Sequence, residues 1–354
     1  MYCRKLVTKH EIPTILGVVC DNKSFYLCFM KHVSILVPEG DCSLVNIEGA
    51  HQVLSRVNEH LATSGKSPLF QIQLVGLQKD TTIKKGLFKI CPDVLIHDLP
   101  QTDLIIIPAV HGDFKKILAA NQDMLSWLVK QYKEGAAVAS LCIGAFLLAE
   151  TGLLKGKSCT THWEFANDFR KMFPAVNLVD DKIITDEKDI YTSGGAYSWL
   201  NLILYLIEKY AGRDMAVRCA KGFEIDIYRN SQLPFIIFSG QRDHEDEDII
   251  KAQNFIETNI HSKIPVGELA DMLSLGRRNL ERRFKKATGN TVMEYVQRVK
   301  IEAVKKCLES SRLNVNEAMN KVGYTDAKAF RIIFKKVTGF APLEYRSRFN
   351  RGFE

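Results

Sequence analysis

The sequence lacks several features that define common classes of protein. It has no Cys-X-X-Cys pair, so its nine cysteines do not form the ligand set of a structural zinc site. Their odd number and scattered spacing favour a reducing compartment over a disulfide framework. No run approaches the ~18–20 apolar residues of a membrane span, and no clean cleavage site for a secretory signal follows the short apolar patch near the N-terminus. We therefore expect a cytoplasmic protein without membrane contact.

Histidine is also sparse, and its positions do not indicate a metal centre. The chain has nine histidines. His51, His60, His97 and His111 show no metal-ligand spacing. We expect neither a bound metal nor a cofactor.

The charge of the chain is unevenly distributed. The formal net charge is +7. Residues 249–354 contain 21 lysines and arginines against 11 acidic residues, a net +10, which leaves −3 for the rest of the chain. A segment this basic on a mildly acidic body indicates a polyanionic partner. Charge alone is equally compatible with a basic face that only contacts water.

Apolar runs and helical spacing alternate between Met30 and Gly212. With 354 residues and 46% hydrophobic composition, the chain is long enough for two or three domains. Buried strands are expected at 33–38, 103–108 and 136–142, and helices at 43–61, 114–133, 143–150 and 196–228. This alternation predicts an α/β domain with a mostly parallel sheet covered on both faces. Ligands in such sheets bind at the carboxyl ends of the strands.

The composition divides the chain into four segments. Residues 1–29 form an extension of uncertain order, because a convincing strand pattern begins only at Met30. Residues 30–228 form the α/β domain. Residues 229–248 contain polar, proline and glycine residues before an acidic run, which is typical of a linker that leads into a helix. Residues 249–354 form an all-α domain.

The all-α domain contains an internal repeat with an offset of 50 residues. Residues 280–289 match residues 330–339, and the Glu-Tyr pair at 294–295 matches the pair at 344–345. Such similarity means that one supersecondary unit is used twice. Each copy predicts two helices and a tight turn, at 266–273 and 277–287 in the first copy. In the second copy, a helix at 315–322 precedes one that begins after Asp326. Apolar anchors recur at each second helix: Leu280 and Phe284, then Phe330 and Phe334.

The opposite face of each second helix is basic. A helix-turn-helix places its second helix in the major groove of DNA, where early arginines reach base edges and later lysines meet phosphates. The sequence therefore predicts a DNA-binding surface made of Arg277, Arg278, Arg282, Lys285, Lys328, Arg331, Lys335 and Lys336.

The segment 323–346, Gly-Tyr-Thr-Asp-Ala-Lys-Ala-Phe-Arg-Ile-Ile-Phe-Lys-Lys-Val-Thr-Gly-Phe-Ala-Pro-Leu-Glu-Tyr-Arg, closely resembles the signature of AraC/XylS-type DNA-binding domains. The resemblance covers about 100 residues. It implies seven helices, a long helix at 293–308 that joins the two units, and recognition helices about one DNA turn apart. It also implies double-stranded promoter DNA and RNA polymerase as partners. Two departures concern the first unit: Gly276 replaces the usual Ser, and the Pro present at Pro342 has no counterpart in the first copy.

Cys142 lies between a buried strand and an apolar helix, with Gly144 close by. This is the pattern of a nucleophile elbow, and the helix N-terminus would lower the pKa of the thiol. His162 follows 20 residues later, and Gly112 follows another strand end. We expect a ligand pocket formed by Cys142, Ile143, His162, Gly112 and Asp41, without assured catalytic residues.

Residues 30–212 resemble the PfpI-like branch of the class I glutamine amidotransferase fold, which is flavodoxin-like. Residues 147–154 and 161–163 are similar to members fused to AraC-type domains, the GlxA-type regulators. In such fusions the resemblance implies a sensor of an unidentified small molecule and a homodimer formed by this domain. Active members carry a Glu after the first strand, where this chain has Cys42 or Ser43. We therefore expect a regulator and no enzyme. A cysteine hydrolase or amidase with Cys142 as nucleophile, and a redox sensor based on Cys142, are the alternatives.

Overall fold

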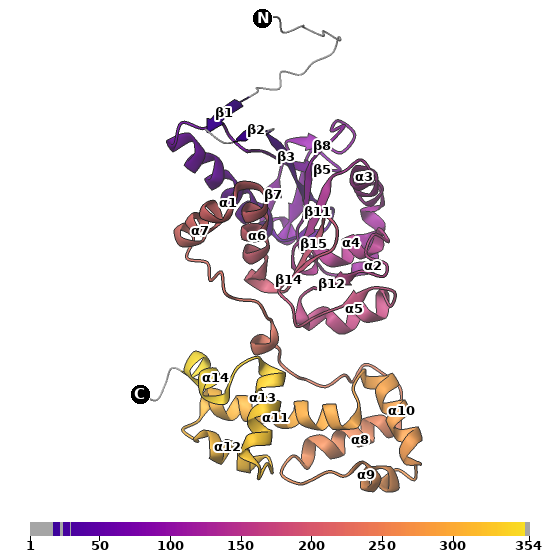
Figure 1. The fold of residues 1–354 in the computed structure, drawn as a ribbon. Coiled ribbons are helices and arrows are strands. Elements are labelled where there is room, and N and C mark those ends of the chain that lie inside the picture. The colour runs from indigo at the N-terminus through magenta and orange to yellow at the C-terminus, as the bar shows by residue number, and fades with distance from the viewer. Residues whose placement is uncertain (1–16, 22–23, 29, 351–354) are drawn as a thin grey trace, which may run out of the picture. The chain divides into compact units, whose positions relative to one another are not determined.

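The computed structural model describes residues 17–21, 24–28 and 30–350, and the chain forms two compact units with their boundary between Asn230 and Ser231 (Figure 1). The expected extension 1–29 falls partly outside the described residues. Its described segments are the antiparallel strands β1 (Gly17–Asp21) and β2 (Ser24–Cys28).

A seven-stranded sheet forms the centre of the first unit. Its strand order is β14-β15-β11-β9-β3-β5-β8, and every pairing is parallel except that of β14 with β15. The prediction of an α/β fold with a mostly parallel sheet is confirmed. The strand order reverses between β3 and β9, which makes their carboxyl ends the place where a ligand is expected. The strands are β3 (Lys31–Val37), β5 (Phe70–Gly76), β8 (Val94–Leu95), β9 (Leu104–Ile107), β11 (Ala137–Ser140), β14 (Ile184–Asp186) and β15 (Ile190–Ser193).

Helices cover both faces of this sheet (Figure 1). One group lies on one face and packs around α1, which contacts β3 and β5. The other group lies on the opposite face, where α4 contacts β9. The first group is α1 (Leu44–Thr63), α6 (Trp199–Ala211) and α7 (Arg213–Gly222), and the second is α2 (Phe114–Ala120), α3 (Gln122–Lys133), α4 (Ala145–Glu150) and α5 (Ala166–Met172).

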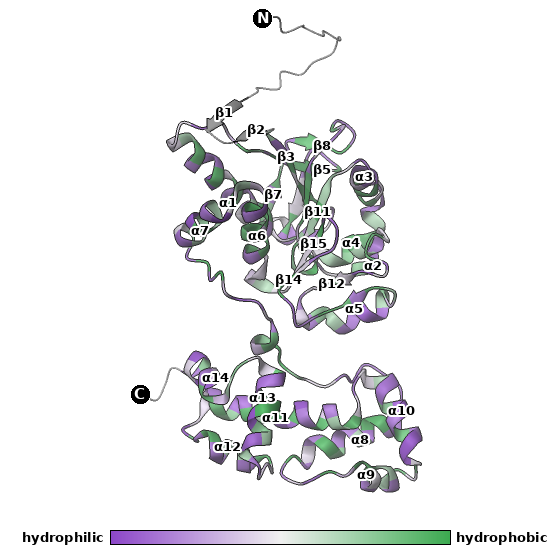
Figure 2. Cartoon of the chain, in the orientation of Figure 1, coloured by the Kyte–Doolittle hydropathy of each residue, from purple (hydrophilic) through white to green (hydrophobic). Residues whose placement is uncertain are grey.

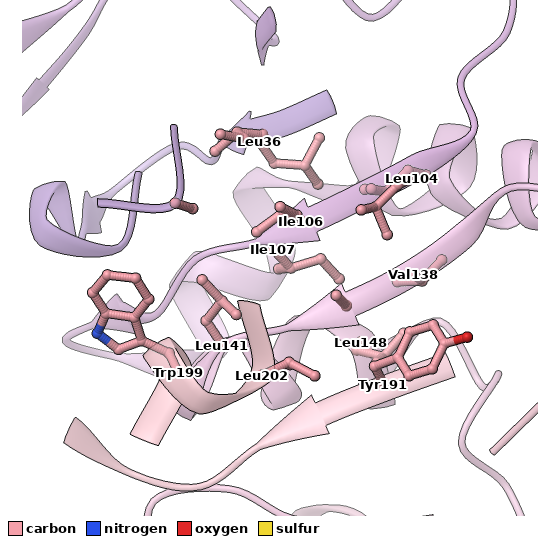
Figure 3. Close-up of a cluster of buried hydrophobic side chains, with 14 of the residues drawn as sticks. Leu36, Leu104, Ile106, Ile107, Val138, Leu141, Leu148, Tyr191, Trp199 and Leu202 are labelled. Atoms are coloured by element: carbon pink, nitrogen blue, oxygen red, sulfur yellow. The ribbon is translucent and has the colours of Figure 1, made fainter. Parts of the chain in front are cut away.

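The central strands are buried on both faces, as parallel strands between helices must be. All four residues of β9, Leu-Ile-Ile-Ile, and all four of β11, Ala-Val-Ala-Ser, are buried. Figure 3 shows Leu104, Ile106 and Val138 on these strands, in one cluster with Trp199 and Leu202 of α6. Figure 2 shows the same division by hydropathy, with hydrophobic strands inside the unit and hydrophilic residues on the outer sides of its helices.

Two predicted helices are interrupted. The helix expected at 114–133 is two helices, because the buried side chain of Asn121 accepts a hydrogen bond from the backbone N–H of Glu39 and donates to the carbonyl oxygens of Glu39 and Ile117. The segment expected to be helical at 196–228 breaks at Gly212, whose φ is +86°, and its last regular helix ends at Gly222.

Short elements complete the described part of the first unit. The strand pairs are β4 (Asp41–Cys42) with β10 (Val110–His111), β6 (Thr81–Ile83) with β7 (Phe88–Ile90), and β12 (Ser158–Cys159) with β13 (Asn177–Leu178). The 3-10 turns are η1 (Lys84–Gly86), η2 (Cys142–Gly144), η3 (Trp163–Phe165) and η4 (Ala196–Ser198).

In the second unit, the described residues contain seven α-helices, the number that the sequence resemblance implies. Two hydrophobic cores share the long helix α11: one lies among α8, α9, α10 and the start of α11, the other among the end of α11 and α12 to α14. The helices are α8 (Glu247–Thr258), α9 (Val266–Met272), α10 (Arg277–Thr288), α11 (Val292–Ser310), α12 (Val315–Lys321), α13 (Ala327–Thr338) and α14 (Pro342–Phe349).

The repeat predicted from the sequence is visible in the ends of the two second helices. Both α10 and α13 end at a glycine in the left-handed conformation, with φ of +71° at Gly289 and +78° at Gly339. Asp326 caps α13 by accepting hydrogen bonds from two backbone N–H groups. Gly276 caps α10 without a side-chain bond. The first copy of the repeat therefore has the weaker N-terminal cap.

Much of the expected linker 229–248 packs on the second unit. The turn η5 (Leu233–Phe235) contacts α13. The ring of Phe238 lies 5.1 Å from that of Tyr295 on α11. The ammonium of Lys305 donates to the carbonyl oxygen of Ile236 at 2.6 Å. These contacts make the residues from Ser231 onward part of the second compact unit.

Candidate functional site

A cavity of about 420 Å³ lies in the first unit beside the turn that carries Cys142. Some of its lining residues belong to segments that follow three neighbouring strands of the sheet, β3, β9 and β11, as the topology predicts. Its lining residues are Ser43, Val45, Asn46, Ala109, His111, Cys142, Ile143, His162, Glu164, Phe165, Ala196, Tyr197 and Trp199.

Cys142 occupies a sharp turn between β11 and α4. Its φ is +55°, a conformation that costs free energy for a residue with a side chain. The turn is held by its backbone: the N–H of Cys142 donates to Ser193 Oγ at 3.1 Å, and its carbonyl accepts from Thr161 Oγ1 at 3.1 Å. A Cβ at Gly144 would lie 2.6 Å from the carbonyl oxygen of Pro108, so only glycine permits this close approach. The elbow geometry predicted from the sequence is therefore present.

The thiol of Cys142 does not have the electrostatic character that the sequence predicts. Burial raises its pKa to about 11, although backbone N–H groups of Ala196 and Ile143 partly oppose the shift. The prediction of a lowered pKa is wrong, because desolvation outweighs the favourable end of the short helix. At neutral pH the side chain is a protonated thiol.

His162 lines the same cavity and is oriented by the backbone of Glu164. Its Nδ1 accepts a hydrogen bond from the backbone N–H of Glu164 at 3.1 Å, which places the proton of the neutral ring on Nε2. Burial lowers the pKa of the imidazole. A Cβ at Gly195 would lie 2.3 Å from Cδ2 of His162, so the ring packs directly on this glycine.

The carboxylate of Asp41, a predicted pocket residue, is engaged by Lys84. Oδ1 of Asp41 accepts a hydrogen bond from the backbone N–H of Lys84 at 3.0 Å, and Oδ2 accepts one from the ammonium of Lys84 at 3.2 Å. Neither Asp41 nor Gly112 is among the lining residues, unlike the predicted Cys142, Ile143 and His162. Ser43 does line the cavity. It caps α1 and accepts a hydrogen bond from the backbone N–H of Asn46 at 3.4 Å.

Sequence patterns did not identify several lining residues. Asn46 is buried and accepts a hydrogen bond from the backbone N–H of Ala109 at 3.0 Å. Ala196 has a φ of +48°, and the exposed Tyr197 follows it. In the sequence, the segment that contains Ala196 and Tyr197 is marked only by the Gly-Gly pair at 194–195 before an apolar helix. Such a pair by itself indicates no particular ligand.

The second unit carries the predicted basic surface on α10 and α13. All eight predicted side chains are exposed. In α10, Arg277 contacts Glu281 at 3.2 Å, Arg282 contacts Asn279 at 3.0 Å, and Lys285 lies 3.8 Å from Glu294. The remaining five have no ion pair or hydrogen bond between side chains within the described ranges: Arg278, Lys328, Arg331, Lys335 and Lys336.

One arginine of α10 has a different position from the rest. Arg283 points back to the N-terminus of α8 and binds both oxygens of Asp246, with Nε 2.9 Å from Oδ2. It also lies 3.0 Å from Asp248. The hydrogen bond with Arg283 holds the pKa of Asp246 below its usual range. The ion pair between Arg283 and Asp246 holds α10 against α8. The predicted cations of α10 lie on its outer face.

Among residues 17–21, 24–28 and 30–350, no helix has the length and apolarity needed to span a bilayer. The same residues contain no group of three or more side chains that could hold a metal ion.

Comparison with known proteins finds a family match in each unit. Residues 57–209 match the DJ-1/PfpI family, and residues 269–348 match a helix-turn-helix domain family. The HTH-type transcriptional regulator GbdR of Pseudomonas aeruginosa is 22% identical over 308 residues, which are 86% of this chain and 81% of GbdR. The xylose operon regulatory protein of Escherichia coli is 33% identical over 101 residues, 28% of this chain and 26% of that protein.

A solved structure of an AraC family transcriptional regulator from Pseudomonas putida covers 55% of this chain and 99% of its own, at 19% identity and a TM-score of 0.47.

Proposed function

We propose, from the premise that this chain is an AraC-type regulator with a DJ-1/PfpI domain, that it binds promoter DNA through α10 and α13 and senses a small molecule in the cavity beside Cys142. The observation that carries the proposal is the pair of exposed basic faces on two helices of one repeated unit. Five of their cations have no ion pair within the described ranges, so they are available to a polyanion.

The two faces differ from an ordinary solvated surface in their regularity. The lysines at the ends of the helices occur at the same repeat positions, 285–286 and 335–336. The inner faces are held by equivalent anchors, Leu280 with Phe284 and Phe330 with Phe334, all fully buried. A helix-turn-helix that inserts two such helices into successive major grooves reads a bipartite site.

The first unit is proposed as the sensor. Its cavity is lined by apolar, aromatic and a few polar side chains, as in small-molecule sites. A ligand changes transcription only if it binds the DNA-competent state with an affinity different from that for the other state. We further propose that this unit forms a homodimer, that the DNA-bound protein recruits RNA polymerase, and that the protein is cytoplasmic.

Several features favour a sensor over a hydrolase. The thiol of Cys142 is protonated at neutral pH because burial raises its pKa to about 11. Nδ1 of His162 is engaged by the backbone of Glu164. Ser43 lines the cavity in the region where the resemblance to active members leads us to expect a glutamate. A neutral thiol without a positioned base and carboxylate is a poor nucleophile.

The test is selection of duplexes from a random library by the full chain at low ionic strength. A bipartite sequence should be enriched. Lys335→Ala should weaken binding to the selected duplex, whereas Lys155→Ala, at an exposed cation of the first unit, is the matched control and should not. Cys142→Ala should bind as the parent does. Failure to enrich any sequence would contradict the proposal.

A further inference from the structure

The helices α10 and α13 agree in their buried anchors and helix ends but differ at some outward positions. The buried anchors, the terminal lysines and the C-terminal glycine are equivalent in the two helices. At one outward position a cation is replaced by a large apolar side chain: α10 has Arg282 where α13, 50 residues later, has Ile332.

Ile332 is an exposed apolar side chain within a cationic face. It is 62% exposed, whereas its neighbour Ile333 packs against the hydrophobic core of the second half of the unit. With roughly 100° of rotation per residue, Ile332 lies inside an arc of about 140° that is otherwise occupied by cations. Those cations are Lys328, Arg331, Lys335 and Lys336, all exposed.

We propose that Ile332 reads the 5-methyl group of a thymine in the major groove, so that α13 selects an A·T pair at this place. The inference rests on the proposed DNA binding. The thymine methyl is the apolar group that bases present in the major groove, and apolar side chains contact it there. The side chain of Ile332 has no hydrogen-bonding group, so it gains nothing from the polar edge of a G·C pair.

The equivalent position in α10 selects a different base. The guanidinium of Arg282 is held by Asn279 Oδ1 at 3.0 Å and keeps further N–H groups for an acceptor. Arginine in this position prefers guanine, through O6 and N7. The two halves of the operator therefore differ in sequence, although the helices that read them share one repeat.

The surroundings of Ile332 favour DNA over a protein partner. Its four cationic neighbours have no ion pair with a described residue, and α13 contains no acidic residue. A polyanion is the partner that neutralises all four. A hydrophobic protein partner would have to cover the same cations without compensation.

The experiment uses the full chain and the selected duplex, in which each thymine of the half-site bound by α13 is replaced in turn by deoxyuridine, which lacks only the methyl group. One replacement should weaken binding about fourfold, the effect of one buried methyl group. Ile332→Ala should bind the thymine and deoxyuridine duplexes equally. Ile332 is exposed, so this variant should retain the parent's Tm.

Two further variants serve as controls. Lys336→Ala should weaken binding to both duplexes and keep their ratio. Leu343→Ala, at an exposed apolar residue of α14, should also keep the ratio.

Equal binding of the parent chain to all these duplexes would overturn the inference while the proposed function stands. So would an unchanged methyl effect in Ile332→Ala. Failure of the parent chain to bind any duplex is a different result, because it would refute DNA binding itself.

Discussion

The ammonium of Lys300 lies 2.9 Å from the carbonyl oxygen of Val322. Lys300 is on α11 and is 7% exposed, and it also donates to the carbonyl oxygen of Ser262 at 2.9 Å. Ser262 follows α8 in the first half of the second unit, and Val322 ends α12 in the second half. One buried cation thus joins the two halves of the second unit.

Lys300→Met should uncouple the two halves. The methionine keeps the apolar stem but leaves two carbonyl groups without their donor, so the free energy of unfolding should fall by about 1–3 kcal/mol. Affinity for the full operator should fall more than affinity for a single half-site, because the spacing of the helices is no longer fixed. Thermal unfolding and titrations with the two duplexes measure both effects. Equal losses on both duplexes would mean that Lys300 contributes only to stability.

Gly323→Ala should destabilise the second unit more than Gly289→Ala does. Both glycines have a left-handed φ, +73° and +71°, which costs roughly 1–2 kcal/mol for other residues. A Cβ at Gly323 would additionally lie 2.2 Å from the carbonyl oxygen of His261, whereas nothing lies within 4 Å of one at Gly289. Chemical denaturation of the two variants gives the comparison directly. Equal destabilisation would show that the contact with His261 relaxes without cost.

Cys142 should react slowly with iodoacetamide at neutral pH. Its raised pKa, about 11, keeps the proton on sulfur, and the thiolate is the nucleophile. The rate should therefore increase as the pH rises toward 11. Peptide mass spectrometry can follow this rate beside that of Cys91, which is exposed and serves as the internal reference. Full alkylation of Cys142 at pH 7, as fast as that of Cys91, would contradict the assignment of a neutral buried thiol.

Arg331→Ala and Lys336→Ala should have different effects on DNA binding. Arg331, near the middle of α13, is proposed to contact a base, so its loss should relax base preference by ~1–3 kcal/mol. Lys336, near the end of the helix, is proposed to contact phosphate, so its loss should weaken binding to all sequences and reduce the slope of log K against log salt by about 1. Titrations over a range of salt concentrations on the selected and mismatched duplexes separate the two. An equal loss of affinity for every sequence in Arg331→Ala would contradict the proposal that Arg331 contacts a base.

The parts of the fold that depend on local periodicity could be predicted from the sequence. The runs at 103–108 and 136–142 contain β9 and β11, because a strand between two helical layers must be apolar throughout. The caps Asp326 and Gly339 mark the ends of α13 as their local preferences require.

The remaining features depend on contacts between distant residues. Asn121 interrupts a helix through bonds to Glu39, 82 residues away. Lys300 contributes to the net charge of residues 249–354, but its burial follows from the packing of two helical units around α11. The pKa of Cys142 follows from the desolvation of the whole turn, which a local pattern does not contain. Tyr197 reaches the cavity only because β15 lies beside β11.

Hydroxyl-radical footprinting of the full chain on its selected duplex tests the central claim, that α10 and α13 occupy two successive major grooves of one duplex. Two protected patches should lie on one face of the DNA about 10 base pairs apart. Insertion of five base pairs between the half-sites should abolish the high-affinity complex. A single patch, or affinity that is unaffected by this insertion, would contradict the claim.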